Sequence, residues 1–310
     1  MNRAALPTRI AQVFLALVVA HCFARLFYTV DFFDESYCVA FQWRFALGDR
    51  PYLDEWSFHQ NFAVFLYPLV WLFRAAQGNS DGLVLFTRGV FFLASMGAAV
   101  AVYRFFRTRA GSEVAYLLTA VFLLLPVSIP NFSYSMLSTY GVVIGALGLF
   151  SLGEKFDRKR AIASGLLHGI AAASDPSQIP TLACLASVAV WHCPRRGDLA
   201  LWYGSVPVLL GIAMLAYAGP IGIEHLAQAS HFLMHSEWTV HFFSHLRDLA
   251  TVGYPRTWAV LVALAAAAYF LRFQKTVAAI ATVLPLAVLV LVQSIGYGTV
   301  YYFTYFGLAG

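Results

Sequence analysis

The chain has 310 residues and a net charge of +5, and 60% of its residues are hydrophobic while only 11% are charged. Soluble domains are typically about 45–50% apolar and about 25% charged, so this composition excludes an ordinary soluble protein. The four cysteines lack paired spacing, which argues against a disulfide framework and against a cysteine-based zinc site. We therefore expect an all-α, polytopic integral membrane protein that forms one domain over residues 1–310.

Apolar segments of near-bilayer length predict about nine to ten transmembrane helices. The nine clearest segments cover residues 10–29, 83–104, 114–130, 136–152, 160–174, 177–193, 199–218, 256–272 and 276–295. The first is too long for the apolar core of a signal peptide, so we expect it to be retained. Basic residues gather in the loops at 104–109, 155–160, 195–196 and 272–275. The positive-inside rule assigns these loops to the cytoplasm of a bacterial inner membrane, and they explain the net charge without a nucleic-acid partner.

The loop at 30–82 follows the first helix and is predicted to be extracytoplasmic. Residues 31–60 within it hold six of the fifteen carboxylates of the chain. The segment Glu35–Leu47 contains no proline or glycine and stops at Gly48, which predicts a helix. The segment 61–77 is too short in its apolar part to cross the bilayer, and Pro68 interrupts it. We therefore expect two interfacial, juxtamembrane helices in this loop.

Several residues of this loop carry a family resemblance. Asp34 and Glu35 follow the first helix, a G-x-x-P-Y-x-D pattern runs from Gly48 to Asp54, and Arg88 stands at the start of the next span. With these features the chain resembles the GT-C superfamily of membrane glycosyltransferases, which includes protein O-mannosyltransferases and aminoarabinose transferases. The resemblance implies inverting transfer of a sugar from a polyprenyl-phosphate donor to an extracytoplasmic lipid, glycan or protein, with Asp34 as the base.

The residues themselves leave two roles open for each acid of the first pair. Inverting transfer requires a carboxylate that takes a proton from the acceptor, and Asp34 stands at the depth of a lipid headgroup. Asp34 is equally suited to cap the helix that starts at Glu35. Glu35 could orient the partner of Asp34 or bind a cation, or it could be a solvated acid of the first helical turn.

A second polar group of the same loop follows the turn at Pro51. Its members are Asp54, Glu55, His59 and Gln60. Carboxylates that converge here would suit Mg²⁺ or Mn²⁺, or would form a hydrogen-bonding floor for sugar hydroxyls. The alternative is a hydrated turn without a ligand.

Arg88 is the leading candidate to meet the charge of the lipid phosphate. An ionised side chain inside an apolar span is costly, and is therefore a functional hypothesis by default. The alternative is that Arg88 extends outward to pair with Asp81. Arg74 on the second interfacial helix is a weaker candidate for the same role.

The later outer loops add four candidates for substrate binding. Tyr134 and Asp175 lie in short loops where they could donate or accept hydrogen bonds from a sugar, although Asp175 also suits a simple Asp-Pro turn. The long loop at 219–255 holds five of the nine histidines, including His231 and His235. Their spacing of four permits a zinc site, a contact with donor or acceptor, or packing on an amphipathic surface helix.

Two other function classes fit the same composition. A lipid or sugar transporter should carry charges at the membrane midplane in broken helices, and the predicted spans contain few such charges. The other alternative is a noncatalytic membrane subunit of GT-C-like architecture.

Overall fold

The computed structural model describes residues 5–28, 34–54, 60–124, 130–152, 156–175, 178–193 and 195–218. The regular structure in these ranges is helical, as the all-α prediction requires. The helices are α1 (Ala5–Tyr28), α2 (Asp34–Leu47), α3 (Asn61–Gln77), α4 (Leu83–Ala110), α5 (Ser112–Leu124), α6 (Tyr134–Ser151), α7 (Arg158–Ser174), α8 (Ile179–His192), α9 (Arg196–Leu199) and α10 (Ser205–Ala218). A π-helical turn, Ala200–Gly204, joins α9 to α10 into one continuous helix.

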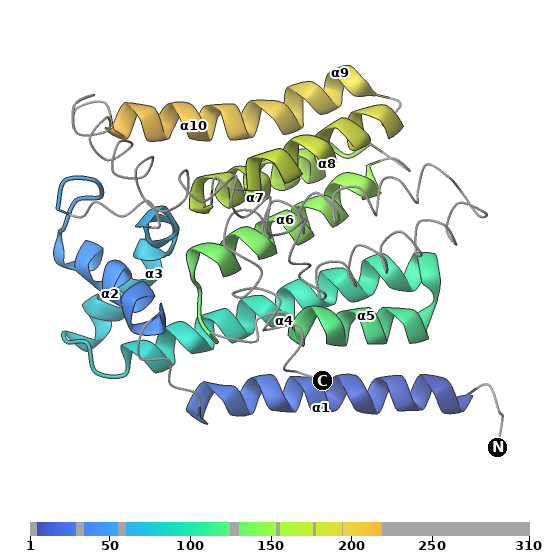
Figure 1. Ribbon diagram of the computed structural model, residues 1–310, viewed down its shortest axis with the longest axis horizontal. Coiled ribbons are helices and arrows are strands. Elements are labelled where there is room, and N and C mark those ends of the chain that lie inside the picture. The colour runs from blue at the N-terminus through green and yellow to red at the C-terminus, as the bar shows by residue number, and fades with distance from the viewer. Residues whose placement is uncertain are drawn as a thin grey trace, which may run out of the picture.

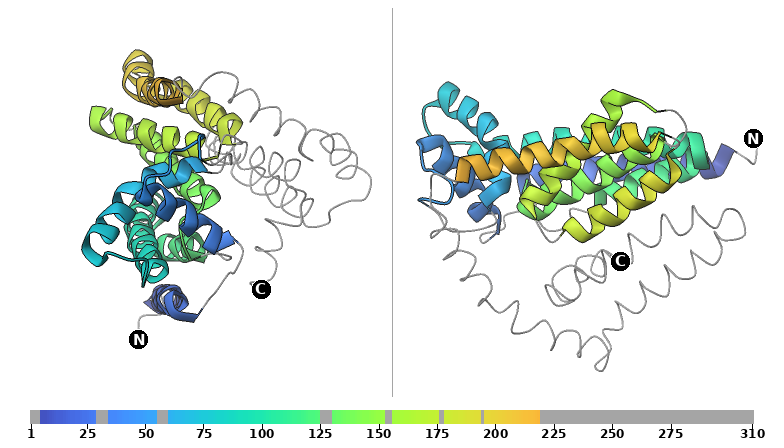
Figure 2. Two further views of the ribbon diagram at one scale, coloured as in Figure 1. Left: turned by 90° about the vertical axis from the view of Figure 1, so that its left-hand side faces the viewer. Right: turned by 90° about the horizontal axis from the view of Figure 1, so that it is seen from above.

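Most of these helices run back and forth along one axis (Figure 1). Helices α2 and α3 gather at one end of the bundle, which we call the α2–α3 end (Figures 1 and 2). The start of α1, the corner between α4 and α5, and α9 lie at the opposite end (Figure 1). A hydrogen bond of 2.6 Å from Thr8 Oγ1 to Glu113 Oε1 joins the starts of α1 and α5 there. Helices α4 and α9 carry basic residues into this opposite end, in agreement with the predicted grouping of the basic loops.

In the part of the chain that the structure describes, four helices are long and apolar enough to cross a membrane. They are Thr8–Tyr28, Leu83–Ala110, Tyr134–Ser151 and Arg196–Ala216, with the shorter apolar helix Ser112–Leu124 beside them. These helices are compatible with an integral membrane protein. Seven of the nine predicted spans coincide with helices of the structure. The spans predicted at 256–272 and 276–295 lie outside the described residues.

Both helices that were predicted in the first loop are present. Helix α2 ends before Gly48, whose φ of 114° is readily adopted only without a side chain. Helix α3 ends at Gly78, which has a φ of 78° and donates its N–H to the carbonyl of Arg74. Neither α2 nor α3 is among the helices long and apolar enough to span a membrane. Their position across one end of the bundle therefore agrees with the prediction from Pro68 and the short apolar run (Figure 1).

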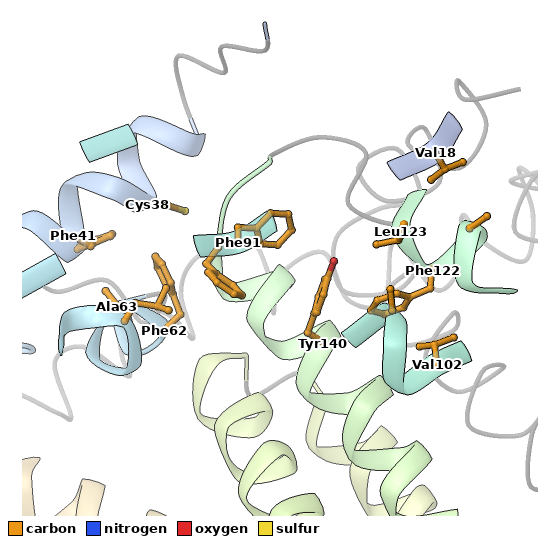
Figure 3. Packing of buried hydrophobic residues seen from close by; sticks show 14 of the residues in the cluster. Val18, Cys38, Phe41, Phe62, Ala63, Phe91, Val102, Phe122, Leu123 and Tyr140 are labelled. Carbon is orange, nitrogen blue, oxygen red and sulfur yellow. The ribbon is translucent and has the colours of Figure 1, made fainter. Parts of the chain in front are cut away.

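The main hydrophobic core extends from α2 and α3 through α4 and α6 to α5 (Figure 3). Phe62 lies near Phe91, and Tyr140 lies between Phe91 and Phe122, with ring centroids 5.6 and 5.0 Å away (Figure 3). Cys38 is buried in this core and forms no disulfide. The continuous core fixes the interfacial helices on the end of the bundle.

Helices α6 and α7 approach each other closely because α6 carries glycines on the contact face. A Cβ atom on Gly141 would lie 2.6 Å from the Leu167 carbonyl oxygen, and one on Gly145 would lie 2.3 Å from the His168 ring. His168 is fully enclosed, and its Nδ1 lies 2.7 Å from the Tyr203 hydroxyl in the π-helical turn. This packing brings the ends of α6 and α7 together beside α3.

Candidate functional site

A buried ion pair fixes the start of α2 against α4. Arg88 Nε donates to Glu35 Oε1 at 2.7 Å, and Arg88 Nη2 donates to Glu35 Oε2 at 2.5 Å. Only 2% of Glu35 and 5% of Arg88 is exposed. Glu35 stands in the first turn of α2 and Arg88 in the second turn of α4. A bidentate pair of this kind is both strong and directional, so it sets the orientation of the first turn of α2.

Further hydrogen bonds extend this pair to two other parts of the fold. Arg88 Nη1 donates to the Leu26 carbonyl at 2.8 Å, near the end of α1. Asn131, just before α6, donates through Nδ2 to Thr87 Oγ1 at 2.8 Å and lies 3.4 Å from Glu35 Oε1. We call Glu35, Thr87, Arg88 and Asn131 the charged cluster. It joins α1, α2, α4 and the segment before α6 at a single point.

Two sequence-based alternatives are corrected by this cluster. Arg88 does not pair with Asp81, because Glu35 reaches deeper and takes both parallel donors of the guanidinium. Asp81 instead contacts Asn79 on the exposed turn. Glu35 is not a solvated acid of the first turn, because α4 covers it. Asp34 is the first residue of α2, and its side chain lies outside the described residues.

Arg25 is a basic residue near the charged cluster that the sequence prediction missed. It stands in the last turn of α1, and the charges of both Arg88 and Glu35 act on it. These three side chains together carry one net positive charge when they are ionised. An arginine inside an apolar span was a signal for this position, as it was for Arg88. The prediction treated the first span only as an anchor.

Two hollows lie beside the charged cluster, between α1 and α4. The first, the α1–α4 groove, is a shallow hollow that is largely open to the surface. It is lined by Leu26, Phe27, Ser80, Gly82, Leu83, Val84, Leu85 and Arg88. The second, the Arg25 cavity, is a narrow gap with room for about one water molecule. It is lined by Cys22, Arg25, Leu26, Phe91, Phe92, Ser95, Leu123 and Pro130. Leu26 lines both hollows, and each has mostly apolar walls with one arginine.

A second buried polar cluster lies where α7 ends and α8 begins. We call its members, Ser174, Asp175, Gln178 and Thr181, the Asp175 cluster; all four are buried. Gln178 Nε2 lies 3.4 Å from Asp175 Oδ2. The hydroxyl oxygens of Ser174 and Thr181 have no hydrogen-bond partner in the described part of the chain. Each buried hydroxyl without a partner costs about 1–3 kcal/mol of stability. Asp175 is thus an enclosed acid in the turn that joins α7 to α8, where the Gln178 N–H donates to the Asp175 carbonyl at 3.1 Å. This position agrees with the alternative of a turn between two helices.

Helix α3 joins the Asp175 cluster to the first loop. Asn61 Nδ2 donates to the Ala173 carbonyl at 2.9 Å, and the Tyr52 hydroxyl donates to Asn61 Oδ1. Gln60, a predicted substrate contact, is buried, and its Oε1 accepts from the Tyr52 backbone N–H at 3.0 Å. In the structure Gln60 therefore supports the turn after α2.

The remaining first-loop candidates are only partly described. Asp54 is exposed and accepts a hydrogen bond of 2.7 Å from the Arg50 backbone N–H. Glu55 and His59 lie outside the described residues, so the predicted convergence with Asp54 stays a prediction. Arg74 donates to the Ala46 carbonyl and thereby connects α3 to the end of α2.

The candidates from the later loops are also only partly described. Tyr134 is the first residue of α6, directly after Ser133, whose hydroxyl caps that helix. His231 and His235 lie outside the described residues. Within the ranges that the structure describes, no three His, Cys, Asp or Glu side chains form a group that could hold a metal ion. The Mg²⁺ or Mn²⁺ expectation therefore depends on side chains such as Asp34 and Glu55.

Comparison of this chain with protein families, with curated proteins and with solved structures finds no match.

Proposed function

We propose that the protein is an inverting membrane glycosyltransferase. It would move a sugar from a polyprenyl-phosphate donor to a lipid, glycan or protein acceptor on the extracytoplasmic side. The proposal is carried by one observation: Asp34 directly precedes Glu35, which the Arg88 ion pair fixes at the junction of α1, α2 and α4. The backbone of a catalytic carboxylate has to be held rigidly, and the buried pair supplies that rigidity next to the α1–α4 groove.

In the proposed reaction Asp34 acts as the general base. Its carboxylate takes the proton of the acceptor hydroxyl while that oxygen forms a bond to the anomeric carbon of the sugar. The bond between the anomeric carbon and the phosphate oxygen breaks on the opposite face, and its electron pair leaves with the polyprenyl phosphate. One displacement of this kind inverts the configuration of the sugar.

The charged cluster divides the remaining tasks. Glu35 neutralises Arg88, so in this proposal Glu35 is a positioning residue for Asp34 and does not exchange protons. Arg25 and Arg88 are the basic side chains of this region. They would stabilise the phosphate as the glycosidic bond breaks.

The sidedness of the proposal follows from the arrangement of charges. At the side of the bundle opposite α2 and α3, helix α4 finishes with basic residues and helix α9 begins with one. By the positive-inside rule that end is cytoplasmic, and the α2–α3 end is extracytoplasmic. A bacterial inner membrane is the location that we propose.

Comparison of cell-envelope glycolipids by mass spectrometry tests the proposal. Cells that carry the wild-type chain should contain a glycolipid or glycan with one more sugar residue than cells that lack it. Asp34→Asn should match the cells without the protein, because an amide does not take the proton. Asp81→Asn, which changes an exposed acid at the same end, should match the wild type. Unchanged envelope composition in cells without the protein would overturn the transferase proposal.

A lipid or sugar transporter is the alternative that the same chain allows. His168 is buried between α6, α7 and the π-helical turn, and such turns are frequent at functional sites. Movement of a labelled lipid across vesicles in the absence of any sugar transfer would favour the transporter.

A further inference from the structure

A positively charged surface lies at the end of the bundle opposite α2 and α3. The starts of α7 and α9 form it, and both pack on one buried hydrophobic cluster that includes Ala161, Cys193 and Leu199. Five exposed basic residues belong to this surface, and we call them the basic surface: Arg158, Lys159, Arg160, Arg195 and Arg196. In the described part of the chain, no ion pair joins them to the nearby acids Asp157 and Asp198. The basic surface therefore keeps an excess of positive charge.

An aromatic ring holds one of these basic residues in place. The Cζ atom of Arg158 lies 3.3 Å from the centroid of the Trp202 ring, which belongs to the π-helical turn. At so short a separation the guanidinium has to lie flat on the ring, because a tilted group would bring a nitrogen into the ring atoms. No hydrogen bond or ion pair within the described ranges engages its N–H groups. Arg158 thus presents a planar fork of donors that is oriented in advance, as phosphate recognition requires.

The depth of this fork follows from the helix that carries Trp202. The helix Arg196–Ala216 is long and apolar enough to cross a membrane, and a basic residue begins it. The end of such a span lies at the level of the lipid headgroups, where tryptophan side chains also gather. Leu201 and Val208 are exposed on the same helix and offer an apolar surface to acyl chains. The Arg158 fork therefore lies where the phosphate of a membrane lipid is found.

We propose that Arg158, stacked on Trp202, binds the headgroup phosphate of an anionic phospholipid, with the rest of the basic surface around it. A zwitterionic headgroup carries a cation that the basic surface repels, whereas an anionic headgroup such as that of phosphatidylglycerol carries none. The lipid is a bound component of the membrane and takes no part in a reaction. No residue of this site belongs to the charged cluster, so the inference does not depend on the proposed function.

Lipid binding to the purified full-length chain in detergent micelles tests the proposal. Native mass spectrometry measures the retention of added phosphatidylglycerol and of phosphatidylcholine, and the wild type should retain phosphatidylglycerol several-fold more tightly. Arg158→Gln should weaken the binding of phosphatidylglycerol about tenfold, because it removes charge-assisted hydrogen bonds. Arg158→Lys should keep part of the affinity, because it keeps the charge but loses the planar fork. Wild-type affinity in Arg158→Gln would overturn the proposal.

A second pair of variants tests the stacking without any change of charge. Trp202→Leu removes the ring beneath the guanidinium and should weaken the binding of phosphatidylglycerol. Trp202→Phe keeps an aromatic face and should lie between Trp202→Leu and the wild type. Wild-type affinity in Trp202→Leu would show that the stacked arginine is not the site.

The matched control is an exposed cation at the same end of the bundle. Arg104 stands near the end of α4 and outside the basic surface. Arg104→Gln should bind phosphatidylglycerol as the wild type does. A loss equal to that of Arg158→Gln would mean diffuse attraction by the net charge and would contradict a specific site.

Two competitors define what is recognised. Glycerol phosphate, a soluble anion with the same phosphate chemistry, should displace phosphatidylglycerol weakly. Displacement at equal concentrations would assign the site to a free anion instead of a lipid. Phosphatidylcholine that binds as tightly as phosphatidylglycerol would remove the requirement for a negatively charged headgroup, and with it the proposal.

Discussion

The charged cluster and the Asp175 cluster are both buried and polar, but they differ in the hydrogen bonds that the described residues give them. Glu35 accepts two short bonds from Arg88, and Asn131 and the Leu26 carbonyl complete the network. In the Asp175 cluster the contact between Gln178 and Asp175 is long, at 3.4 Å, and two hydroxyls have no described partner. A satisfied network stabilises a fold, whereas an unsatisfied one weakens it. The two clusters therefore serve different purposes.

The difference also separates positioning from binding. The strongest donors of Arg88 bind the carboxylate of Glu35. The pair therefore orients the helices around it. The Asp175 cluster retains hydroxyl groups that a ligand could use, next to the Asn61 contact that connects α7 to α3. Our prediction of Asp175 as a substrate contact remains open on this ground.

The largest effect is expected when the charged cluster is broken. Glu35→Gln should destabilise the protein by about 3–5 kcal/mol, because it leaves the Arg88 charge buried without its carboxylate. The free energy of unfolding is measured by titration with sodium dodecyl sulfate in mixed micelles. The paired change Glu35→Leu with Arg88→Met should recover much of this loss, since neither charge then remains.

An exposed ion pair supplies the control for that measurement. Arg44 Nε lies 2.6 Å from Asp49 Oδ2, but both side chains are partly open to solvent. Asp49→Asn should cost no more than about 1 kcal/mol. Equal losses of stability in Asp49→Asn and Glu35→Gln would mean that the buried Glu35–Arg88 pair contributes no more than an exposed ion pair.

The next effect concerns the amide that completes the charged cluster. Asn131→Ala should cost about 2 kcal/mol, because it removes the donor to Thr87 and the acceptor of the Phe132 N–H at once. Unfolding in the same micelles measures this loss. Asn79→Ala, which alters an exposed amide on the turn before α4, is the matched control and should change stability little. Similar values for the two variants would mean that the Asn131 network contributes nothing.

The helices could be predicted from the sequence because their signals are local. A long apolar run needs no partner to identify it, and Gly48 and Gly78 end α2 and α3 where turn chemistry requires. The same applies to Pro68, which kept 61–77 out of the predicted spans. No such local signal identifies contacts between residues that are far apart in the chain. Glu35 and Arg88 are 53 residues apart, and Asp81, much nearer to Arg88 in the chain, was the wrong alternative.

For the candidate site, the residues could be predicted from the sequence better than their roles. The sequence singled out an arginine and an acid beside a predicted span, and the structure brings them together. Sequence reasoning could not tell that they neutralise each other. Arg25 was missed because its own segment indicates no partner, and the charges of Glu35 and Arg88 act on it only when α4 packs beside α1. The hydroxyls of Ser174 and Thr181, which have no hydrogen-bond partner among the described residues, are likewise visible only after packing.

A smaller effect is expected at the contact between α3 and α7. Asn61→Ala should cost about 1 kcal/mol, because the Ala173 carbonyl and the Tyr52 hydroxyl each lose a partner at the edge of the bundle. Tyr52→Phe removes only one of these two bonds and should cost less. The same unfolding titration gives both losses. Their ratio measures how much the hydrogen bond from Asn61 to the Ala173 carbonyl of α7 contributes to stability. A larger loss in Tyr52→Phe would place the main support in the first loop.

The smallest effect should have the opposite sign, and it bears most directly on the comparison. Ser174→Ala removes a buried hydroxyl that has no partner in the described structure, and alanine is the better helix former at the end of α7. The variant should gain about 0.5–1 kcal/mol, whereas every change in the charged cluster loses stability. Ser187→Ala is the control, because that hydroxyl donates to the Ala183 carbonyl on the exposed face of α8 and its loss offsets the helical gain. If Ser174→Ala loses stability instead, the hydroxyl has a partner in the folded protein, and the two clusters no longer differ in kind.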